Sequence, residues 1–306
     1  MDTITLTADD GADLDVLQWT PTGTVRGIVQ IVPGITEYAA RYDEFASKLA
    51  ADGWFVVSSD HRGHGPRALA NGDLGRLPDR GYHQLLDDLS LVADDARSRY
   101  PGLPWVVVGH SMGSFLVRIL AAQRGRDMAA LVVIGTGGPL GALTQVGITL
   151  ATAQVVLLGE DSRSPLLDTL TFGSYNQGFH PARTKWDWLS RDRRQVDAYI
   201  ADPLCGFVCS AGYYRELIRM SAAANSVDVM RATPPRLPVG LFSGALDPVG
   251  GAGRGVRHVA RNLAAHGVKH VDLRLFGKDR HEILNEQDRP RVQAEIIDWI
   301  DRAVEV

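Results

Sequence analysis

The sequence predicts an α/β fold, in which a mostly parallel, eight-stranded sheet carries helices on both faces and is interrupted by a helical cap. Short, continuously apolar segments alternate with segments of helical periodicity, as in a sheet that is covered on both faces. This alternation stops near Gly135 and resumes near Pro238. The residues between them include several tryptophans and tyrosines and show no strand periodicity, which predicts a helical insertion above the sheet.

The first part of the core is predicted over residues 1–136. Apolar and polar residues alternate on both sides of the turn Asp9–Gly11, which is typical of a hairpin. Strands are then expected at the continuously apolar segments 27–32, 54–57, 105–109 and 131–134. Helices are expected where apolar residues recur every three or four positions, at 42–51, 85–100 and 115–123.

The cap is predicted over residues 137–230, and the second part of the core over residues 231–306. In this second part, strands are expected at 239–242 and 271–276, and helices at 254–266 and 292–304. The cap opens with the uncharged apolar segment 139–159, whose length alone suggests a membrane span. Its glutamines, threonines and glycines, and its place directly after a core strand, favour a buried or lid-like segment instead.

The composition of the chain limits the classes of function that we expect. The formal net charge of −4 and the pI of about 6.1 do not favour a nucleic-acid-binding face. The N-terminal residues are acidic and alternating, without the basic start and apolar core of a signal peptide, and a cytoplasmic location is expected. Cys205 and Cys209 are accompanied by no cluster of further ligands, so two buried, reduced thiols are expected rather than a metal site. No cofactor is expected either.

The strongest local signal is the motif G-x-S-x-G at Gly109–Gly113. It lies between a predicted strand and a predicted helix, which is the context of a serine held on a sharp, strained turn. Glycines on either side allow neighbouring elements to pack closely. The N–H groups at the start of the following helix point to where negative charge develops in a reaction. Ser111 is therefore the candidate nucleophile.

A serine of this kind needs an acid and a base from later in the chain, in the order Ser, Asp, His. Asp247 follows the predicted strand 239–242 after a short turn and is the candidate acid; its alternative role is to cap the next helix. His281 follows the last predicted strand by a few residues and is the candidate base. His281 would accept the proton of Ser111, and Asp247 would orient the imidazole.

Two backbone N–H groups are expected to form an oxyanion hole. One belongs to Met112, the residue after the nucleophile, and the other to Ile35, in the loop that follows the strand 27–32. Glu37, Arg41 and Tyr42 lie just beyond Ile35. We expect them to fix this loop, with contact to a polar head group as the alternative. We expect the consecutive residues Asp60, His61 and Arg62 to brace the sheet. We expect His110 to pack against its surroundings and to form hydrogen bonds.

Several motifs together resemble one family. They are residues 60–65, 109–113, 243–247 and 280–286 of the predicted core and residues 184–207 of the predicted cap. Over residues 25–300 the chain resembles the monoacylglycerol lipases and lysophospholipase-like serine hydrolases of the α/β-hydrolase fold. The resemblance implies a carboxylester hydrolase that acts on a single acyl chain attached to glycerol or a similar small alcohol. It also implies an acyl tunnel above Ser111 that is shaped by the cap, 137–230.

The chain departs from this family at two places. The family's usual His-Gly before the oxyanion residue is Pro33-Gly34, and its usual Gly-Gly before Arg-His is Lys278-Asp279. A serine peptidase or a C–C bond hydrolase would use the same three residues, and a binding protein could keep the fold without the chemistry. The expected partner is a small lipid ester, with at most weak peripheral contact to a membrane; the oligomeric state is left open.

Overall fold

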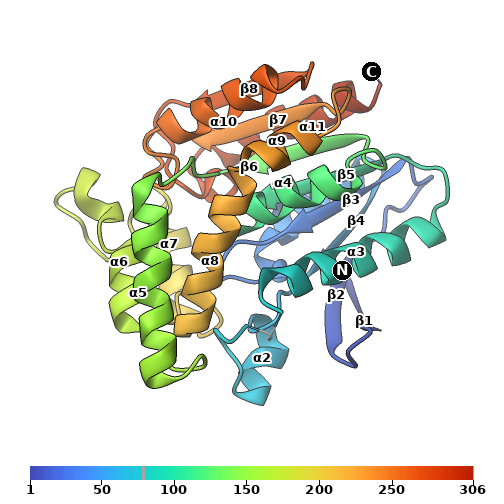
Figure 1. Cartoon of the computed structure of the whole chain (residues 1–306). Coiled ribbons are helices and arrows are strands. Elements are labelled where there is room, and N and C mark those ends of the chain that lie inside the picture. The colour runs from blue at the N-terminus through green and yellow to red at the C-terminus, as the bar shows by residue number, and fades with distance from the viewer. Residues whose placement is uncertain (78–79, 306) are drawn as a thin grey trace.

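One eight-stranded sheet organises the molecule in the computed structural model, which describes residues 1–77 and 80–305 (Figure 1). Its strand order is β1-β2-β4-β3-β5-β6-β7-β8. The strands are β1 (Asp2–Thr7), β2 (Asp13–Trp19), β3 (Gly27–Val32), β4 (Trp54–Ser59), β5 (Trp105–His110), β6 (Ala130–Ile134), β7 (Val239–Gly244) and β8 (Val271–Phe276). The hairpin β1–β2 joins β4 in antiparallel orientation, and all other pairs are parallel. The predicted strand number and orientation are confirmed.

Helices cover both faces of the sheet, as the continuously apolar strands predict. One face packs against α1 (Asp43–Ala51) and α11 (Arg289–Val304). The other packs against α3 (Tyr82–Arg99), α4 (Met112–Arg124) and α10 (Arg254–Ala265). Alternate residues of β5 show the division, since Val107 packs on the α4 side and Val106 and Val108 pack on the α1 side.

The observed bounds differ from the predicted ones mainly at helix starts. Helix α4 begins at Met112, three residues before the predicted start, because the turn at Ser111 leads directly into it. Helix α2 (Gly65–Asn71) was not predicted. Its glycine-rich start and its end at Gly72, in left-handed conformation, both read as loop in the sequence.

The chain between β6 and β7 is largely helical and begins beyond the carboxyl ends of the strands. Helices α5 (Ala142–Leu158), α6 (Pro165–Phe172) and α7 (Arg193–Ala201) stand beside the end of the sheet (Figure 1). In α5 only Ala151 is fully buried, so the expectation of a buried segment at 139–159 is wrong and the lid-like alternative fits. Its apolar side chains face a cavity or solvent. Among the described residues no helix is long and apolar enough to cross a membrane.

The last part of this connection belongs to the layer that covers the sheet. Helices α8 (Ala211–Ala224) and α9 (Val227–Ala232) pack against α4 and return the chain to the start of β7. Tyr213, Met220 and Met230 are buried there in the same apolar cluster as the α4 face of the sheet. These two helices therefore form the crossover that parallel strands require.

Candidate active site

Ser111 lies on a sharp turn between β5 and α4. Its φ of 53° and ψ of −118° are rarely adopted by a side-chain-bearing residue, so the turn holds it in strained geometry. A Cβ on Gly113 would lie 2.2 Å from the carbonyl oxygen of Val32, and one on Gly109 would lie 2.5 Å from that of Gly113. The motif therefore needs both glycines so that β3, β5 and α4 can meet closely, as predicted.

The candidate base and acid form a buried hydrogen-bonded pair. Nδ1 of His281 lies 3.0 Å from Oδ1 of Asp247, and the two side chains are 2% and 0% exposed. A carboxylate can only accept here, so Nδ1 carries the proton and Nε2 is left free to accept one. Asp247 is held in turn by the hydroxyl of Ser243 at 3.2 Å and the N–H of Val249 at 2.9 Å.

The candidate oxyanion loop, residues 33–36, is fixed from both sides of Ile35. The N–H of Gly34 donates to Glu37 Oε1 at 2.6 Å, and the N–H of Thr36 donates to His64 Nε2 at 2.9 Å. Thr36 has a φ of 53°, a strained value for a β-branched residue. Among the described residues, no acceptor is hydrogen-bonded to the N–H of Ile35. Met112 is the first residue of α4, so its N–H has no partner within the helix.

Pro33, a departure from the family pattern, is accommodated without loss of this loop. Its carbonyl accepts a hydrogen bond from Nε2 of buried His61 at 3.0 Å. Asp60, the residue before His61, accepts a hydrogen bond from the N–H of Ala39 at 2.7 Å. Arg62, the residue after, pairs with Asp88 at 2.7 Å. The segment 60–62 thus braces the structure through hydrogen bonds, as expected from the sequence.

A buried network of charges lies beside His281. Arg41 pairs with Glu37 at 2.6 Å and with both carboxylate oxygens of Glu282 at 2.8 and 2.7 Å. Glu37 also accepts hydrogen bonds from Tyr42 at 2.7 Å and from Nδ1 of His110 at 2.9 Å. Burial raises the pKa of Glu37, but His110 and Arg41 outweigh it and hold that pKa well below its usual range. Glu37 thus fixes the loop 33–36, which confirms the role expected for it.

His110 links this network to the candidate base. Its ring centroid lies 4.8 Å from that of His281. Burial lowers the pKa of His110, but the hydrogen bond and charge of Glu37 raise it by more, so the pKa lies above its ordinary value. Glu37 and Glu282 are thus paired with Arg41, and Glu37 is also hydrogen-bonded to His110.

The predicted site residues meet in one cavity of about 500 Å³. Ser111, His281, Ile35 and Met112 line its floor, while Asp247 lies behind His281. Apolar side chains from α5, α6 and α8 line the rest; they include Leu143, Val146, Leu150, Leu167, Leu170, Phe172, Leu217 and Ile218. Its volume and apolar lining are typical of a site for a small apolar ligand.

The family model Hydrolase_4, described as serine aminopeptidase S33, matches residues 23–288. The chain belongs to this family of α/β hydrolases. The monoacylglycerol lipase of Mycolicibacterium smegmatis is 28% identical over 285 residues, which are 92% of this chain and 90% of that protein. Human monoglyceride lipase is 31% identical over 206 residues, 66% of this chain and 59% of the human protein.

Solved structures agree with this assignment. A thermostable carboxyl esterase from Bacillus coagulans, crystallised in complex with glycerol, superposes with a TM-score of 0.93 at 27% identity, over 99% of this chain and 98% of the esterase. A lipase in its open form gives a TM-score of 0.89 at 27% identity, over 100% of this chain and 99% of that one. The predicted family and the α/β-hydrolase fold are confirmed, and the chain is a monoacylglycerol lipase-like α/β hydrolase.

In this hydrolase the cap touches the floor of the cavity through polar contacts. The N–H of His281 donates to the carbonyl of Trp188 at 3.3 Å, and that of Glu282 donates to Leu189 at 2.7 Å. The hydroxyl of Tyr199 bonds to the carbonyl of Thr36 at 3.1 Å. Trp186, Trp188 and Tyr199 form an aromatic cluster within the cap and also line the cavity.

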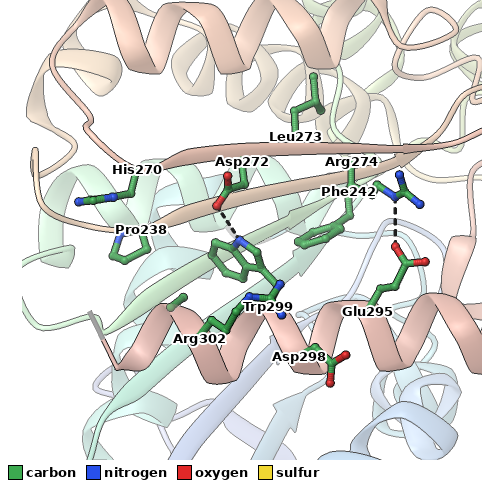
Figure 2. A pocket seen from close by; sticks show the side chains of 11 residues that line it. Pro238, Phe242, His270, Asp272, Leu273, Arg274, Glu295, Asp298, Trp299 and Arg302 are labelled. Atoms are coloured by element: carbon green, nitrogen blue, oxygen red, sulfur yellow. Dashed lines mark hydrogen bonds and ion pairs between the residues drawn. The ribbon is translucent and has the colours of Figure 1, made fainter.

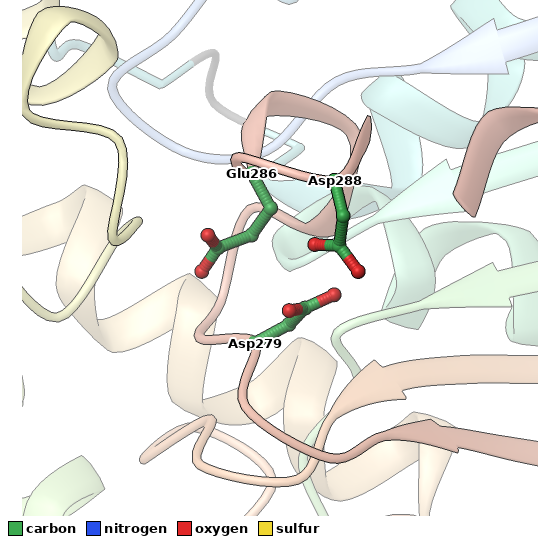
Figure 3. A group of neighbouring side chains, drawn as sticks. All are labelled: Asp279, Glu286 and Asp288. Atoms are coloured by element: carbon green, nitrogen blue, oxygen red, sulfur yellow. The ribbon is translucent and has the colours of Figure 1, made fainter. Parts of the chain in front are cut away.

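Three carboxylates of the hydrolase converge just beside the His281 loop (Figure 3). Oxygens of Asp279, Glu286 and Asp288 lie within 4.8 Å of one another. Arg191 of the cap lies 2.5, 3.1 and 2.9 Å from the three groups, and Arg291 also pairs with Asp288 at 2.6 Å. Burial, and then the charges of Glu286 and Asp288, raise the pKa of Asp279 to about 7. Asp279, the second departure from the family pattern, therefore contacts the cap through Arg191.

The sequence did not reveal two contributors to this site. His64 was placed in a glycine-rich loop without a role, and Glu282 was noted only as part of a motif. Each acts through a partner distant in the chain, Thr36 and Arg41 respectively. The one available signal was the close spacing of charged residues after Ile35, which pointed to the loop but not to these partners.

Proposed function

We propose that this hydrolase is a serine carboxylester hydrolase that cleaves monoacylglycerols or similar lipid esters through an acyl-enzyme intermediate. The observation that carries the proposal is the apolar cavity of about 500 Å³ whose floor holds Ser111 and His281. An acyl chain would lie among the leucines of the cap, with its ester carbon above Ser111. The cap residues that line the cavity are the proposed substrate-binding surface.

The reaction follows from the positions of the side chains. Oγ of Ser111 attacks the ester carbon while Nε2 of His281 takes its proton, and Asp247 stabilises the imidazolium that results. The N–H groups of Ile35 and Met112 would bind the developing oxyanion, and losing one such donor typically costs about 100- to 1000-fold in rate. The alcohol leaves with the proton from His281. Water then attacks the acyl-enzyme, gives its proton to His281, and releases the fatty acid and free Ser111.

Peptide cleavage, the activity in the family's description, is supported less well. An aminopeptidase needs an acceptor for the substrate's ammonium group. Glu37 and Glu282 are the carboxylates lining the cavity among the described residues, and both are paired with Arg41. An ammonium group would have to displace Arg41 from a buried network, which is costly.

A single acyl chain on glycerol is the proposed substrate because relatives covering most of the chain are monoacylglycerol lipases. The esterase with a TM-score of 0.93 was crystallised with glycerol. A lysophospholipid-like head group is the alternative, since a relative from Bacillus subtilis at 29% identity is a phospholipase. Release of a glycerophospho-alcohol, such as glycerophosphocholine, against release of free glycerol distinguishes the two.

The test is hydrolysis of p-nitrophenyl esters from acetate to palmitate, followed by 1-monoacylglycerols and lysophospholipids. We expect activity at medium or long chains that disappears in Ser111→Ala. A fluorophosphonate probe should label the wild type but not Ser111→Ala. Ser221→Ala is the matched control, because Ser221 lines the same cavity and should still be labelled. A folded wild type that cleaves no ester but releases amino acids from peptides would contradict the proposal.

A further inference from the structure

Strand β8 forms one edge of the sheet, and within residues 1–77 and 80–305 no strand pairs with its outer side. Its three central residues, Asp272, Leu273 and Arg274, are all exposed, so both faces of the strand are open at its middle. The carbonyls of His270 and Phe276 accept bonds from the β7 side. Backbone groups alternate in direction along a strand, so even-numbered residues face β7. The N–H and C=O groups of Val271, Leu273 and Leu275 therefore point outward.

A second copy of the same strand can satisfy all of these groups at once. In an antiparallel pair related by a two-fold axis at Leu273, Leu273 lies opposite its own copy and Val271 lies opposite Leu275 of the second copy. Each outward N–H then meets an outward C=O. If the register of the two strands is shifted by two residues in either direction, some of these outward N–H and C=O groups are left unpaired.

The side chains favour the same register. With the axis at Leu273, Asp272 lies opposite Arg274 of the second copy, twice in the dimer. A shift to an axis at position 272 sets Asp272 against its own copy, and a shift to 274 sets Arg274 against its own copy. Opposite charges across a strand pair stabilise it, whereas like charges destabilise it. Backbone and side chains thus select one register.

Contacts within each copy hold these two side chains in place. Figure 2 shows Asp272 and Arg274 extending toward α11, with Leu273 on the other side of the strand. Asp272 Oδ2 accepts from Nε1 of Trp299 at 2.9 Å, and Nε of Arg274 donates to Glu295 at 3.1 Å. The second carboxylate oxygen of Asp272 and the terminal nitrogens of Arg274 are left for the partner. The Arg274 side chain is 54% exposed.

The opposite edge of the sheet lacks this property. Strand β1 reads DTITLT, with a single charge at Asp2, so no register of two copies pairs opposite charges. Exposed edges are normally protected by charged side chains, lysine especially, by proline or by a bulge. Strand β8 has neither lysine nor proline, and its two charged residues, Asp272 and Arg274, are of opposite sign, so two copies of the strand need not repel each other. We propose that β8 is a self-association surface, on which a second copy of this chain pairs antiparallel about Leu273 to give a continuous sheet across the dimer.

Sedimentation of the full chain across a range of concentrations tests this proposal. We expect association from the 33.2 kDa chain to twice that mass. Exposed Arg254, Arg257 and Arg261 of α10 lie on the Leu273 side of the sheet, so the ionic strength should be about 0.15 M to screen their repulsion. A wild type that stays monomeric up to about millimolar concentration, where even weak interfaces form, would overturn the proposal.

Charge variants test the register. Asp272→Lys places Lys opposite Arg274, and Arg274→Glu places Glu opposite Asp272, so each should weaken self-association about tenfold or more. A mixture of these two variants restores opposite charges at both positions, and so does the double variant Asp272→Arg, Arg274→Asp. Both should dimerise again. Failure of the mixture and the double variant to dimerise would overturn the register.

The fold of each variant is checked separately, because the substitutions at Asp272 and Arg274 each break a contact to α11. Melting temperature and ester hydrolysis should stay near the wild-type values in all variants. Thr5→Lys on β1 is the control for adding charge at an edge and should leave association unchanged. Equal association of wild type and both single variants would show that the dimer uses another surface.

Discussion

Nε2 of His64 accepts a hydrogen bond from the backbone N–H of Thr36 at 2.9 Å. Nδ1 of the same ring donates to the carbonyl of Arg62 at 3.2 Å. His64 must therefore be neutral, and burial lowers its pKa to about 3. Together with Glu37, which holds the N–H of Gly34, it fixes the peptide units on either side of Ile35.

Loss of the His64 acceptor should loosen the oxyanion loop. We expect His64→Ala to lower kcat about tenfold, less than the loss of a whole oxyanion donor, with a smaller change in KM. His64→Gln should restore most of kcat, because its side-chain oxygen can replace Nε2. Steady-state kinetics on one ester measures both. A fall in stability with unchanged kcat would show that His64 has only a structural role.

Asp247→Asn should stop catalysis without disturbing the fold. The amide carries no negative charge, so it cannot stabilise the imidazolium that forms when His281 accepts the proton of Ser111. We expect a decrease in kcat of roughly 10³- to 10⁴-fold, measured with a p-nitrophenyl ester. Ser243→Ala is the matched control, because it removes one of the hydrogen bonds that hold Asp247 and leaves the carboxylate in place. A similar loss in both variants would contradict the assigned roles.

The cluster around Arg191 should make stability depend on pH. The pKa of Asp279 rises from 3.8 to about 7 on folding, so the native state binds its proton more tightly. Its stabilising effect is complete below about pH 4 and is lost as the pH rises through 7. In Asp279→Asn the free energy of unfolding should increase relative to the wild type between pH 4 and 7. Urea unfolding at several pH values measures this, and parallel profiles would argue against the raised pKa.

Leu150 of α5 should limit the length of the acyl chain. It lines the cavity, so Leu150→Trp should lower kcat/KM for long-chain esters and leave acetate almost unaffected. The ratio of palmitate to acetate hydrolysis is the measurement. Leu158→Trp is the control, because Leu158 lies on the same helix, is 62% exposed and does not line the cavity. An equal effect of both variants would place the acyl chain elsewhere.

Local patterns were sufficient to predict most of the fold. The strand before Ser111 and the helix after it can be read from the sequence because apolar periodicity and glycine spacing act over a few residues. The order of Ser111, Asp247 and His281 can be predicted in the same way, because these residues follow the strands β5, β7 and β8. These three residues, with Ile35 and Met112, are brought together by the structure, and their catalytic roles stay predictions.

Contacts between distant segments could not be predicted in this way. The bidentate pair of Arg41 and Glu282 spans 241 residues, and the ion pair of Arg191 and Asp279 spans 88. Nothing in the spacing of either segment indicates the other. The sequence left open whether α5 is buried or lid-like for a different reason, since an uncharged apolar helix usually predicts burial, whereas this one borders a cavity.

The crossover by α8 and α9 means that β6 and β7 are already linked in the way that parallel strands require. Helices α5, α6 and α7 are thus an addition to a connection that is complete without them. Evolution can lengthen, shorten or replace this addition while the residues after β5, β7 and β8 keep their places. The substrate range and the chemistry can then be inherited separately. An exchange of these three helices between relatives would transfer the substrate range without the chemistry.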